Sequence, residues 1–500
     1  MNYQSTRDSK ISFSSAEAIK TGIAPDGGLF VPSEIPSLSA SEIENIKNLS
    51  YVELADFVLG KFLTDYTAEE VHHCASNAYT KEKFESDTIA PLHKLNDNTH
   101  ILELWHGPTC AFKDMALQIL PYLLTKAMKK TGEEKEVIIL VATSGDTGKA
   151  ALEGFKDVEG TNIQVFYPVD GVSKIQKLQM ATQLGKNVNV TAVKGNFDDA
   201  QTGVKKIFSN DDMRKKADEL GYVFSSANSI NWGRLVPQIV YYFYSYATLL
   251  KNNEIKMGDK INIVVPTGNF GNILAAFYAK SMGLPVNKLI CASNKNNVLT
   301  DFINTGVYDR NRKFETTISP SMDILISSNL ERFIYHMSGE NASFVAECMK
   351  KLNEEGKYDI GAELTKKIKE IFVGGYASDE DTVETIKKTN EKYSYIPDTH
   401  TSVAIKVYED YVKETGDNTK TVIASTANPF KFNQSVLSAL VEEREMEGKD
   451  EFELLQMLSE KGNLNIPDSL NNLKKMDVRF KDVCNKEEMW DMVHTFLTNK

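Results

Sequence analysis

Short, continuously apolar runs alternate with stretches of helical periodicity through the middle of this 500-residue chain. A continuous apolar run such as 137–142 is typical of a parallel strand that is covered on both faces. The alternation of such runs with helical stretches predicts an α/β sheet protein. The predicted strands are 100–104, 137–142, 163–167, 188–193, 261–265 and 421–424.

The segments between these runs suggest three domains. Residues up to about 90 combine a turn-rich loop with polar amphipathic helices, and we interpret residues 1–92 as an N-terminal cap. The remaining chain is divided into a larger domain, 93–130 and 235–500, and a smaller α/β domain, 131–234. The most apolar long run, 235–250, is interrupted by polar residues and predicts a buried helix. Residues 294–393 show no obvious chemistry.

Composition and net charge argue against several classes of partner and site. The net charge of −12 argues against nucleic acid or an anionic membrane as the main partner. The five cysteines are odd in number and scattered, which favours free thiols over disulfides or a zinc site, and no metal is expected. The first ten residues contain no apolar core, so we expect no signal peptide and a cytoplasmic protein.

The main candidate for chemistry is Lys113. A Gly-Pro turn leads into an apolar run that opens a helix, and Lys113 stands at its start beside Phe112. The positive end of the helix and partial burial both disfavour the ammonium form, whereas the neighbouring Asp114 suits a helix start. A neutral amine is what Schiff-base chemistry requires. Taken alone, a solvated surface lysine is the commoner case.

Two further turns join a strand to a helix. The segment Thr143–Gly148 brings backbone N–H groups and hydroxyls to a positive helix end, which fits either an anion site or an ordinary helix cap. Segment Gly268–Asn272 has the pattern of a phosphate nest or of a plain tight turn. Neither segment matches a P-loop or a dinucleotide-binding fingerprint.

Two polar segments complete the set. Arg234 lies six residues after Asn228, and its planar fork suits a phosphate, although loop hydrogen bonding and a surface arginine are equally compatible. Segment Ser425–Ala427 follows a predicted strand, and its hydroxyl groups could cap a helix or meet a ring nitrogen.

Taken in order, these segments resemble the threonine synthases, in the longer form with an extra N-terminal domain. The resemblance spans about residues 20–432 and implies a tryptophan-synthase-β-like fold with two open twisted α/β sheets. The motifs that carry it are PDGGLFVP at 25–32, HGPTCAFKD at 106–114, TSGDTG at 143–148, GNFDD at 195–199, NSINWGR at 228–234, PTGNFGN at 266–272 and STANP at 425–429.

The resemblance also implies a cofactor, a substrate and a role for each motif. The cofactor would be pyridoxal 5′-phosphate, bound covalently by Lys113 in the larger domain. The substrate would be O-phospho-L-homoserine, which loses phosphate from Cγ and gains water at Cβ to give L-threonine. The implied cofactor contacts are Lys113, Gly268, Asn269, Phe270, Gly271 and Asn272, with Thr426 at the pyridine nitrogen and Asp146 beside the ring. The implied substrate contacts are Ser144, Thr147, Asn228, Ser229 and Arg234.

Other functions remain open. A serine/threonine dehydratase or a diaminopropionate lyase of the same fold eliminates at Cβ and needs no second phosphate site, so the 228–234 motif and the N-terminal cap argue against both. A non-catalytic sensor of phosphorylated ligands would not need Lys113. Both a monomer and a homodimer are compatible with the sequence.

Overall fold

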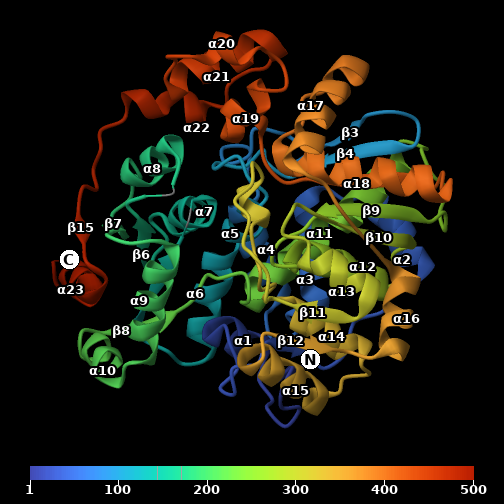
Figure 1. Ribbon diagram of the computed structural model, residues 1–500. Helices are drawn as coiled ribbons and strands as arrows, with labels where there is room; N and C mark the ends of the chain where they lie inside the picture. The colour runs from blue at the N-terminus through green and yellow to red at the C-terminus, as the bar shows by residue number, and fades with distance from the viewer. Residues whose placement is uncertain (144, 171, 500) are drawn as a thin grey trace.

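The larger of two main β-sheets contains six strands in the order β13-β10-β9-β14-β4-β3. The computed structural model, shown in Figure 1, describes residues 1–143, 145–170 and 172–499. Neighbouring strands are parallel except at the β3–β4 edge. The strands are β3 (Leu92–Lys94), β4 (Thr99–Glu103), β9 (Ile261–Pro266), β10 (Val286–Ser293), β13 (Phe372–Tyr376) and β14 (Thr421–Ser425).

The smaller main sheet contains five parallel strands in the order β15-β7-β6-β5-β8. Its strands are β5 (Glu136–Ala142), β6 (Thr161–Pro168), β7 (Val188–Val193), β8 (Tyr222–Ser225) and β15 (Val483–Cys484). Residues 137–141 of β5 are buried, as expected for a strand covered on both faces. The chain returns to this sheet at its end, where β15 pairs with β7 and α23 (Met489–Thr498) packs against α9 (Phe197–Ser209) (Figure 1). The sequence-based division places these last residues in the larger domain.

Helix α11 (Trp232–Lys251) connects the two halves and is buried along most of its length, as predicted for the apolar run. It packs against α12 (Gly271–Ser281) of the larger sheet and against α3 (Tyr51–Phe62) of the N-terminal region. The helices formed by the described residues include none that combines the length and apolar character needed to cross a membrane.

The N-terminal helices begin where capping boxes occur. Ser14, Ser39, Ser50 and Thr67 each cap a helix, and a glutamate three residues later returns a bond to the cap backbone. These helices cover α11 and α6 (Leu120–Lys130). The N-terminal elements are β1 (Tyr3–Ser5), α1 (Ser15–Thr21), β2 (Phe30–Pro32), α2 (Ala40–Asn45), η1 (Ile46–Asn48), α3 and α4 (Ala68–Ala78).

The remaining helices flank the two sheets or follow them in the chain. Three helices pack on strands of the smaller sheet, α7 (Asp146–Phe155), α9 and α10 (Asp211–Glu219), and α8 (Lys174–Ala181) packs against α7. The elements between 298 and 415 are α13 (Val298–Thr305), β11 (Val307–Asp309), η2 (Pro320–Met322), α14 (Leu330–Met337), α15 (Ala342–Glu354), β12 (Lys357–Asp359), α16 (Ala362–Ile371), α17 (Asp379–Tyr393) and α18 (Thr399–Thr415). The C-terminal elements are η3 (Pro429–Phe432), α19 (Asn433–Leu437), α20 (Glu443–Met446), α21 (Glu451–Gly462), α22 (Asp468–Asn471), η4 (Asn472–Lys475) and η5 (Lys486–Glu488).

Candidate active site

Three adjacent parallel strands of the larger sheet, β9, β14 and β4, bring three of the predicted segments to one edge. The Gly268 loop follows β9, Thr426 follows β14, and the segment that carries Lys113 follows β4. Ligands of open α/β sheets bind outside the carboxyl ends of the strands. This edge is therefore the natural place for a ligand.

The lysine segment is fixed to the strand beside it. The backbone N–H of Phe112 donates to the carbonyl of Thr426 at 2.8 Å, and that of Asn428 donates to the carbonyl of Cys110 at 3.0 Å. Lys113 is the N-cap residue of the four-residue helix α5 (Asp114–Leu117). These bonds hold Lys113 and Thr426 in one rigid unit.

The neighbouring Asp114 has a structural role. Its carboxylate accepts the backbone N–H of Thr109 at 2.8 Å and the Thr109 hydroxyl at 2.7 Å, which closes the turn before the lysine. Burial raises the pKa of Asp114 to about 6, against the lowering effect of these two bonds. Asp114 therefore acts as a residue of the helix start.

Lys113 lies in a largely buried, charged environment. Its side chain is 13% exposed, and Nζ lies 4.0 Å from Oδ2 of Asp146 and 5.1 Å from the centre of the Phe112 ring. Burial lowers the pKa of the Lys113 ammonium; Asp146 opposes this effect, whereas Lys431 and Arg234 reinforce it. The amine is thus more readily deprotonated than that of an ordinary surface lysine.

The Gly268 loop opens α12. Phe270 adopts a left-handed conformation with φ of 62°, and the first N–H groups of α12 have no acceptor within the helix. A serine and an asparagine from a distant loop hold the turn: the Ser327 hydroxyl donates to the Gly268 carbonyl at 2.8 Å, and the Asn329 N–H donates to the Asn269 carbonyl at 3.1 Å. Free N–H groups at a helix start form a favourable anion site.

Asn272 extends this loop into α11. Its Oδ1 accepts hydrogen bonds from the hydroxyls of Tyr241, at 2.8 Å, and Tyr242. Its Nδ2 is buried, and no described residue accepts a hydrogen bond from it. The two tyrosines orient the amide so that its donor side remains available.

The turn after β5 places Asp146 and Thr147 at the start of α7. The helix cap expected as an alternative for this motif is supplied by Thr143, whose hydroxyl accepts the N–H groups of Gly145 at 3.0 Å and Gly148 at 2.9 Å. Thr147 is half-buried and is not needed for capping. Ser144, predicted as a substrate contact, lies outside the described residues.

The 228–234 segment turns back on itself before α11. Arg234 is 4% exposed, and its Nη1 donates to the carbonyl of Ala227 at 2.5 Å. Its Nε is buried without an acceptor among the described residues, and burial lowers the pKa of its guanidinium to about 10. Asn228 is exposed, and the Ser229 hydroxyl lies 3.4 Å from that of Ser328. A buried guanidinium whose Nε has no acceptor among the described residues is well suited to bind an anion.

Segment 327–332 lies in the region where the sequence showed no chemistry, yet it joins two of the predicted loops. Asn329 donates from Nδ2 to the Ser229 carbonyl at 3.2 Å, in addition to its bond with the Gly268 loop. Arg332, fully buried, donates to Asn329 and to the carbonyls of Ile230 and Phe30. The PDGGLFVP motif therefore supports the site through the Phe30 carbonyl, which holds Arg332 against Asn329. Only the run of serine and asparagine residues hints at this role.

A histidine also supports the Gly268 loop indirectly. His400 accepts the N–H of Ser321 at 3.1 Å, and its other ring nitrogen lies 2.9 Å from Oδ1 of Asp398. The carbonyl of Ser321 packs so closely on Gly268 that an added Cβ would lie 2.8 Å from it. Gly268 is thus required by a close backbone approach.

Lys431 is the most important residue that sequence reasoning missed. Its side chain is fully buried, and its Nζ lies 2.7 Å from Oδ1 of Asp146. Burial disfavours a carboxylate, but Lys431 and Lys113 outweigh that effect and hold the pKa of Asp146 below its usual range. The signal in the sequence was a lysine between two phenylalanines, a few residues after a buried strand.

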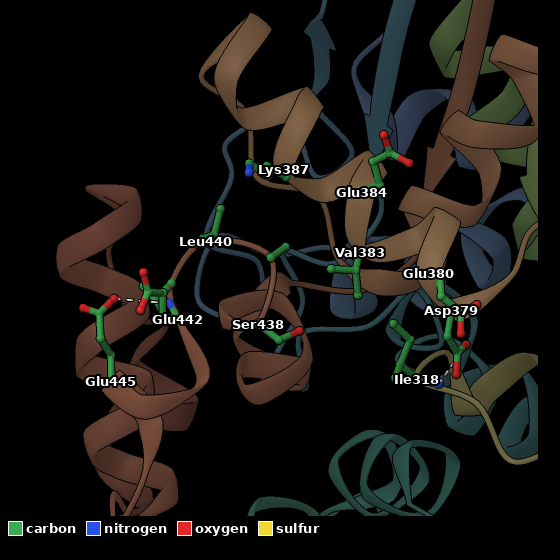
Figure 2. A pocket seen from close by; sticks show the side chains of 12 residues that line it. Ile318, Asp379, Glu380, Val383, Glu384, Lys387, Ser438, Leu440, Glu442 and Glu445 are labelled. Carbon is green, nitrogen blue, oxygen red and sulfur yellow. Dashed lines mark hydrogen bonds between the residues drawn. The ribbon is translucent and has the colours of Figure 1, made fainter.

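An open groove between α17 and residues 438–445 is a different feature (Figure 2). None of the predicted site residues lines it. Its charged lining residues are Asp379, Glu380, Glu384, Glu442, Glu445 and Lys387. This mostly acidic lining disfavours a phosphorylated ligand.

Comparison with known families agrees with this geometry. Residues 2–79 match the family described as "Threonine synthase N terminus", residues 85–427 match "Pyridoxal-phosphate dependent enzyme", and residues 401–496 match "Threonine synthase, C-terminal". The chain belongs to the threonine synthase family. The expected α/β fold of pyridoxal-phosphate enzymes, with an added N-terminal domain, is confirmed.

Individual relatives support the assignment over most of the chain. Threonine synthase of Schizosaccharomyces pombe is 37% identical, and the match covers 88% of this chain and 89% of the relative. Threonine synthase-like 1 of Homo sapiens is 41% identical over 85% of this chain, which spans 58% of that longer relative. The crystal structure of pyridoxal-phosphate-bound threonine synthase from Brucella melitensis is 34% identical, with a TM-score of 0.87 and coverage of 100% of this chain and 99% of that one.

The residues at the larger sheet's edge fit pyridoxal phosphate, the cofactor of this family. One buried donor of the Gly268 loop, Asn272 Nδ2, has no acceptor among the described residues. The α12 start offers further N–H groups, and Lys113 offers an amine of lowered pKa. Such a set of donors suits an anionic group next to a reactive amine.

Proposed function

We propose that this chain is a threonine synthase, a carbon–oxygen lyase that converts O-phospho-L-homoserine and water into L-threonine and phosphate. The observation that carries the proposal is Arg234, a buried arginine that has no acidic partner among the described residues and lies close to a lysine of lowered pKa. A second set of anion donors lies separately at the start of α12. A substrate with its own phosphate, used together with a phosphorylated cofactor, explains both.

In the proposed assignment, Lys113 holds pyridoxal phosphate covalently and Gly268–Asn272 hold its phosphate. Thr426 would direct its hydroxyl to the pyridine nitrogen, and Asp146 would lie beside the ring. When bound, the cofactor supplies an electron sink for the bond broken at the substrate's Cα.

The substrate is proposed to lie between the two sheets. Thr147, Asn228, Ser229 and Arg234, together with Ser144, would bind its phosphate and carboxylate. Displaced from the cofactor by the substrate's amino group, Lys113 Nζ would then remove the proton from Cα, since burial lowers the pKa of its ammonium. After a second proton is removed from Cβ, phosphate would leave from Cγ. Return of a proton to Cγ, addition of water at Cβ and return of a proton to Cα would then give L-threonine.

Thr426 would moderate this chemistry. A neutral hydroxyl cannot stabilise a protonated ring nitrogen as a carboxylate would. The cofactor would then withdraw electrons less strongly, which suits a route that must control carbanions at more than one carbon.

A serine/threonine dehydratase or a diaminopropionate lyase is the nearest alternative. Such an enzyme eliminates at Cβ and has no use for a second anion site, so the buried Arg234 argues against it. The sensor hypothesis is disfavoured because it gives no role to the lowered pKa of Lys113.

The decisive assay supplies the cofactor-loaded protein with O-phospho-L-homoserine and measures phosphate and threonine together. We expect equal amounts of the two products. Phosphate release without threonine would point to an elimination enzyme, and the absence of both products would refute the proposal.

We propose a cytoplasmic enzyme, a monomer or a homodimer, whose partner is the small phosphorylated amino acid and neither nucleic acid nor membrane. The net charge of −12 supports this view. For the domain limits we retain 1–92, 93–130 with 235–500, and 131–234, with the final strand and helix packed on the smaller sheet.

A further inference from the structure

Lys431 is a fully buried lysine that the proposed chemistry does not use. It lies in η3, directly after strand β14 of the larger sheet. Its ammonium contacts Oδ1 of Asp146 at 2.7 Å and donates to the Thr109 carbonyl and to Oε1 of Gln179, each at 3.2 Å. An ammonium has three N–H donors, and three acceptors surround this one.

Because all three N–H donors of its ammonium have acceptors, Lys431 differs from the residues proposed to bind anions. Arg234 retains a buried donor without an acceptor among the described residues, whereas the Lys431 ammonium has an acceptor for each N–H. A ligand phosphate could bind Lys431 only by displacing Asp146 or a neutral partner. The contacts therefore favour a role directed at protein groups.

The partners of Lys431 come from both halves of the molecule. Thr109 precedes the catalytic lysine on the larger sheet's side, whereas Asp146 begins α7 and Gln179 lies on α8, beside the smaller sheet. One ammonium thus connects the lysine loop to two helices of the other half.

Asp146 is held asymmetrically. Its Oδ1 receives both Lys431 and the Gln176 side chain, the latter at 2.9 Å, while Oδ2 faces Lys113 at 4.0 Å. Two donors on one oxygen fix the carboxylate plane and leave the other oxygen directed at Lys113. We propose that Lys431 is a positioning residue that holds Asp146 as a carboxylate beside Lys113 and ties the smaller sheet to the lysine loop.

Stability alone does not explain such a pair. Burying an ammonium and a carboxylate costs desolvation that their attraction only partly repays, and apolar replacements of buried pairs are often neutral or stabilising. Removing one partner is different, because the other charge then stays buried and unpaired. This asymmetry provides a test that does not need the cofactor.

The first measurement is a double-mutant cycle on the cofactor-free protein. Urea unfolding of wild type, Lys431→Met, Asp146→Asn and the double variant would give four midpoints. We expect both single variants to unfold at lower urea than the double variant. Additive changes would overturn the proposal, because the two side chains would then not act as a pair. If Lys431→Met does not fold, the same conclusion rests on whether adding it to Asp146→Asn raises the midpoint.

The second measurement rests on the proposed function and uses the cofactor-loaded enzymes. For Lys431→Met we expect kcat to fall about 100-fold, the size of effect that a misplaced group produces, with KM for O-phospho-L-homoserine changed by less than about threefold. The double variant should recover part of kcat, since the neutral amide introduced by Asp146→Asn needs no ammonium. A raised KM at unchanged kcat, not restored in the double variant, would instead make Lys431 a substrate ligand.

A matched control is Lys280→Met. Lys280 is half-buried near the end of α12, about two and a half turns after the predicted contacts Gly271 and Asn272, and donates to the Val286 carbonyl at 2.5 Å. Its removal should leave kcat and KM unchanged. Wild-type turnover tests the proposed function itself, so its failure is distinguishable from failure of the unfolding cycle.

Discussion

The two sheets each place a buried aspartate at one edge, and the pKa values of these two aspartates are shifted in opposite directions. Asp114, at the larger sheet's edge, and Asp146, at the smaller sheet's edge, are each the first residue of a helix and are both buried. Burial raises the pKa of Asp114 to about 6, because its partner Thr109 offers only neutral donors. The pKa of Asp146 is lowered, because two ammonium groups outweigh the same burial.

The contrast teaches that the local motif does not decide the chemistry of a strand–turn–helix site. An acid in the first turn of a helix is an ordinary stabilising feature. At the smaller sheet's edge, Asp146 belongs to a charged cluster only because it contacts Lys431, which lies 285 positions later in the chain. The larger edge, by contrast, completes its turn with residues of the same segment.

The largest expected effect that tests the contrast between Asp114 and Asp146 is on the free energy of unfolding. In Asp114→Asn the titration of this group is removed. The pKa of Asp114 is higher in the folded state, about 6, than the ordinary unfolded value near 4, so the folded wild type binds the proton more tightly. Wild type should therefore lose about 3 kcal/mol of unfolding free energy relative to the variant as pH rises from about 3 to about 7.

Urea unfolding of both proteins across this pH range measures the difference. Asp146→Asn provides the opposite case. Because the pKa of Asp146 is lowered in the folded state, its carboxylate stabilises the fold of wild type above the unfolded pKa, and this stabilisation is lost as pH falls below about 4. Parallel pH profiles for wild type and Asp114→Asn would show that the two edges do not differ as described.

A smaller effect concerns the arginine between the edges. Arg234→Met should raise KM for O-phospho-L-homoserine about 30-fold, which corresponds to about 2 kcal/mol for one charge-assisted hydrogen bond. The cofactor-free variant should be at least as stable as wild type, because the native side chain is a buried cation without an acidic partner among the described residues. Equal weakening of O-phospho-L-homoserine and of L-homoserine as a competing ligand would contradict the assignment of Arg234 to phosphate.

The smallest effect concerns the backbone of the larger edge. In Gly268→Ala the new Cβ would lie 2.8 Å from the Ser321 carbonyl oxygen, so the loop must shift. Cofactor affinity should fall about fivefold, or about 1 kcal/mol, the lower end of the cost of overpacking. Gly60→Ala is the matched control, because this exposed glycine within α3 has no neighbour within 4 Å of an added Cβ. It should leave affinity unchanged; equal affinities in both variants would remove the role given to the close approach at Gly268.

Much of this architecture could be predicted from the sequence. The central strands are continuous apolar runs, the buried α11 is a long apolar run, and the strand–turn–helix motifs carry their own glycines and hydroxyls. Strand β15 was not predictable, since it has two residues and forms only by pairing with β7.

The unpredicted parts of the candidate site share one cause. These residues act through contacts with segments far away in the chain: Lys431, Asn329 and His400. The weak local signals, such as the two phenylalanines beside Lys431, do not identify those distant partners. The reverse holds for Asp114, whose contact with Thr109 is local and whose place at a helix start could be read from the sequence.

The central claim is that Lys113 binds the cofactor and moves the proton at Cα. The most direct measurement compares wild type with Lys113→Ala after incubation with pyridoxal phosphate, by visible absorption and by turnover of O-phospho-L-homoserine. We expect the absorption of the lysine-linked cofactor to disappear and kcat to fall by about 10³-fold or more, with the fold retained. Retention of that absorption or of wild-type turnover by Lys113→Ala would contradict the account.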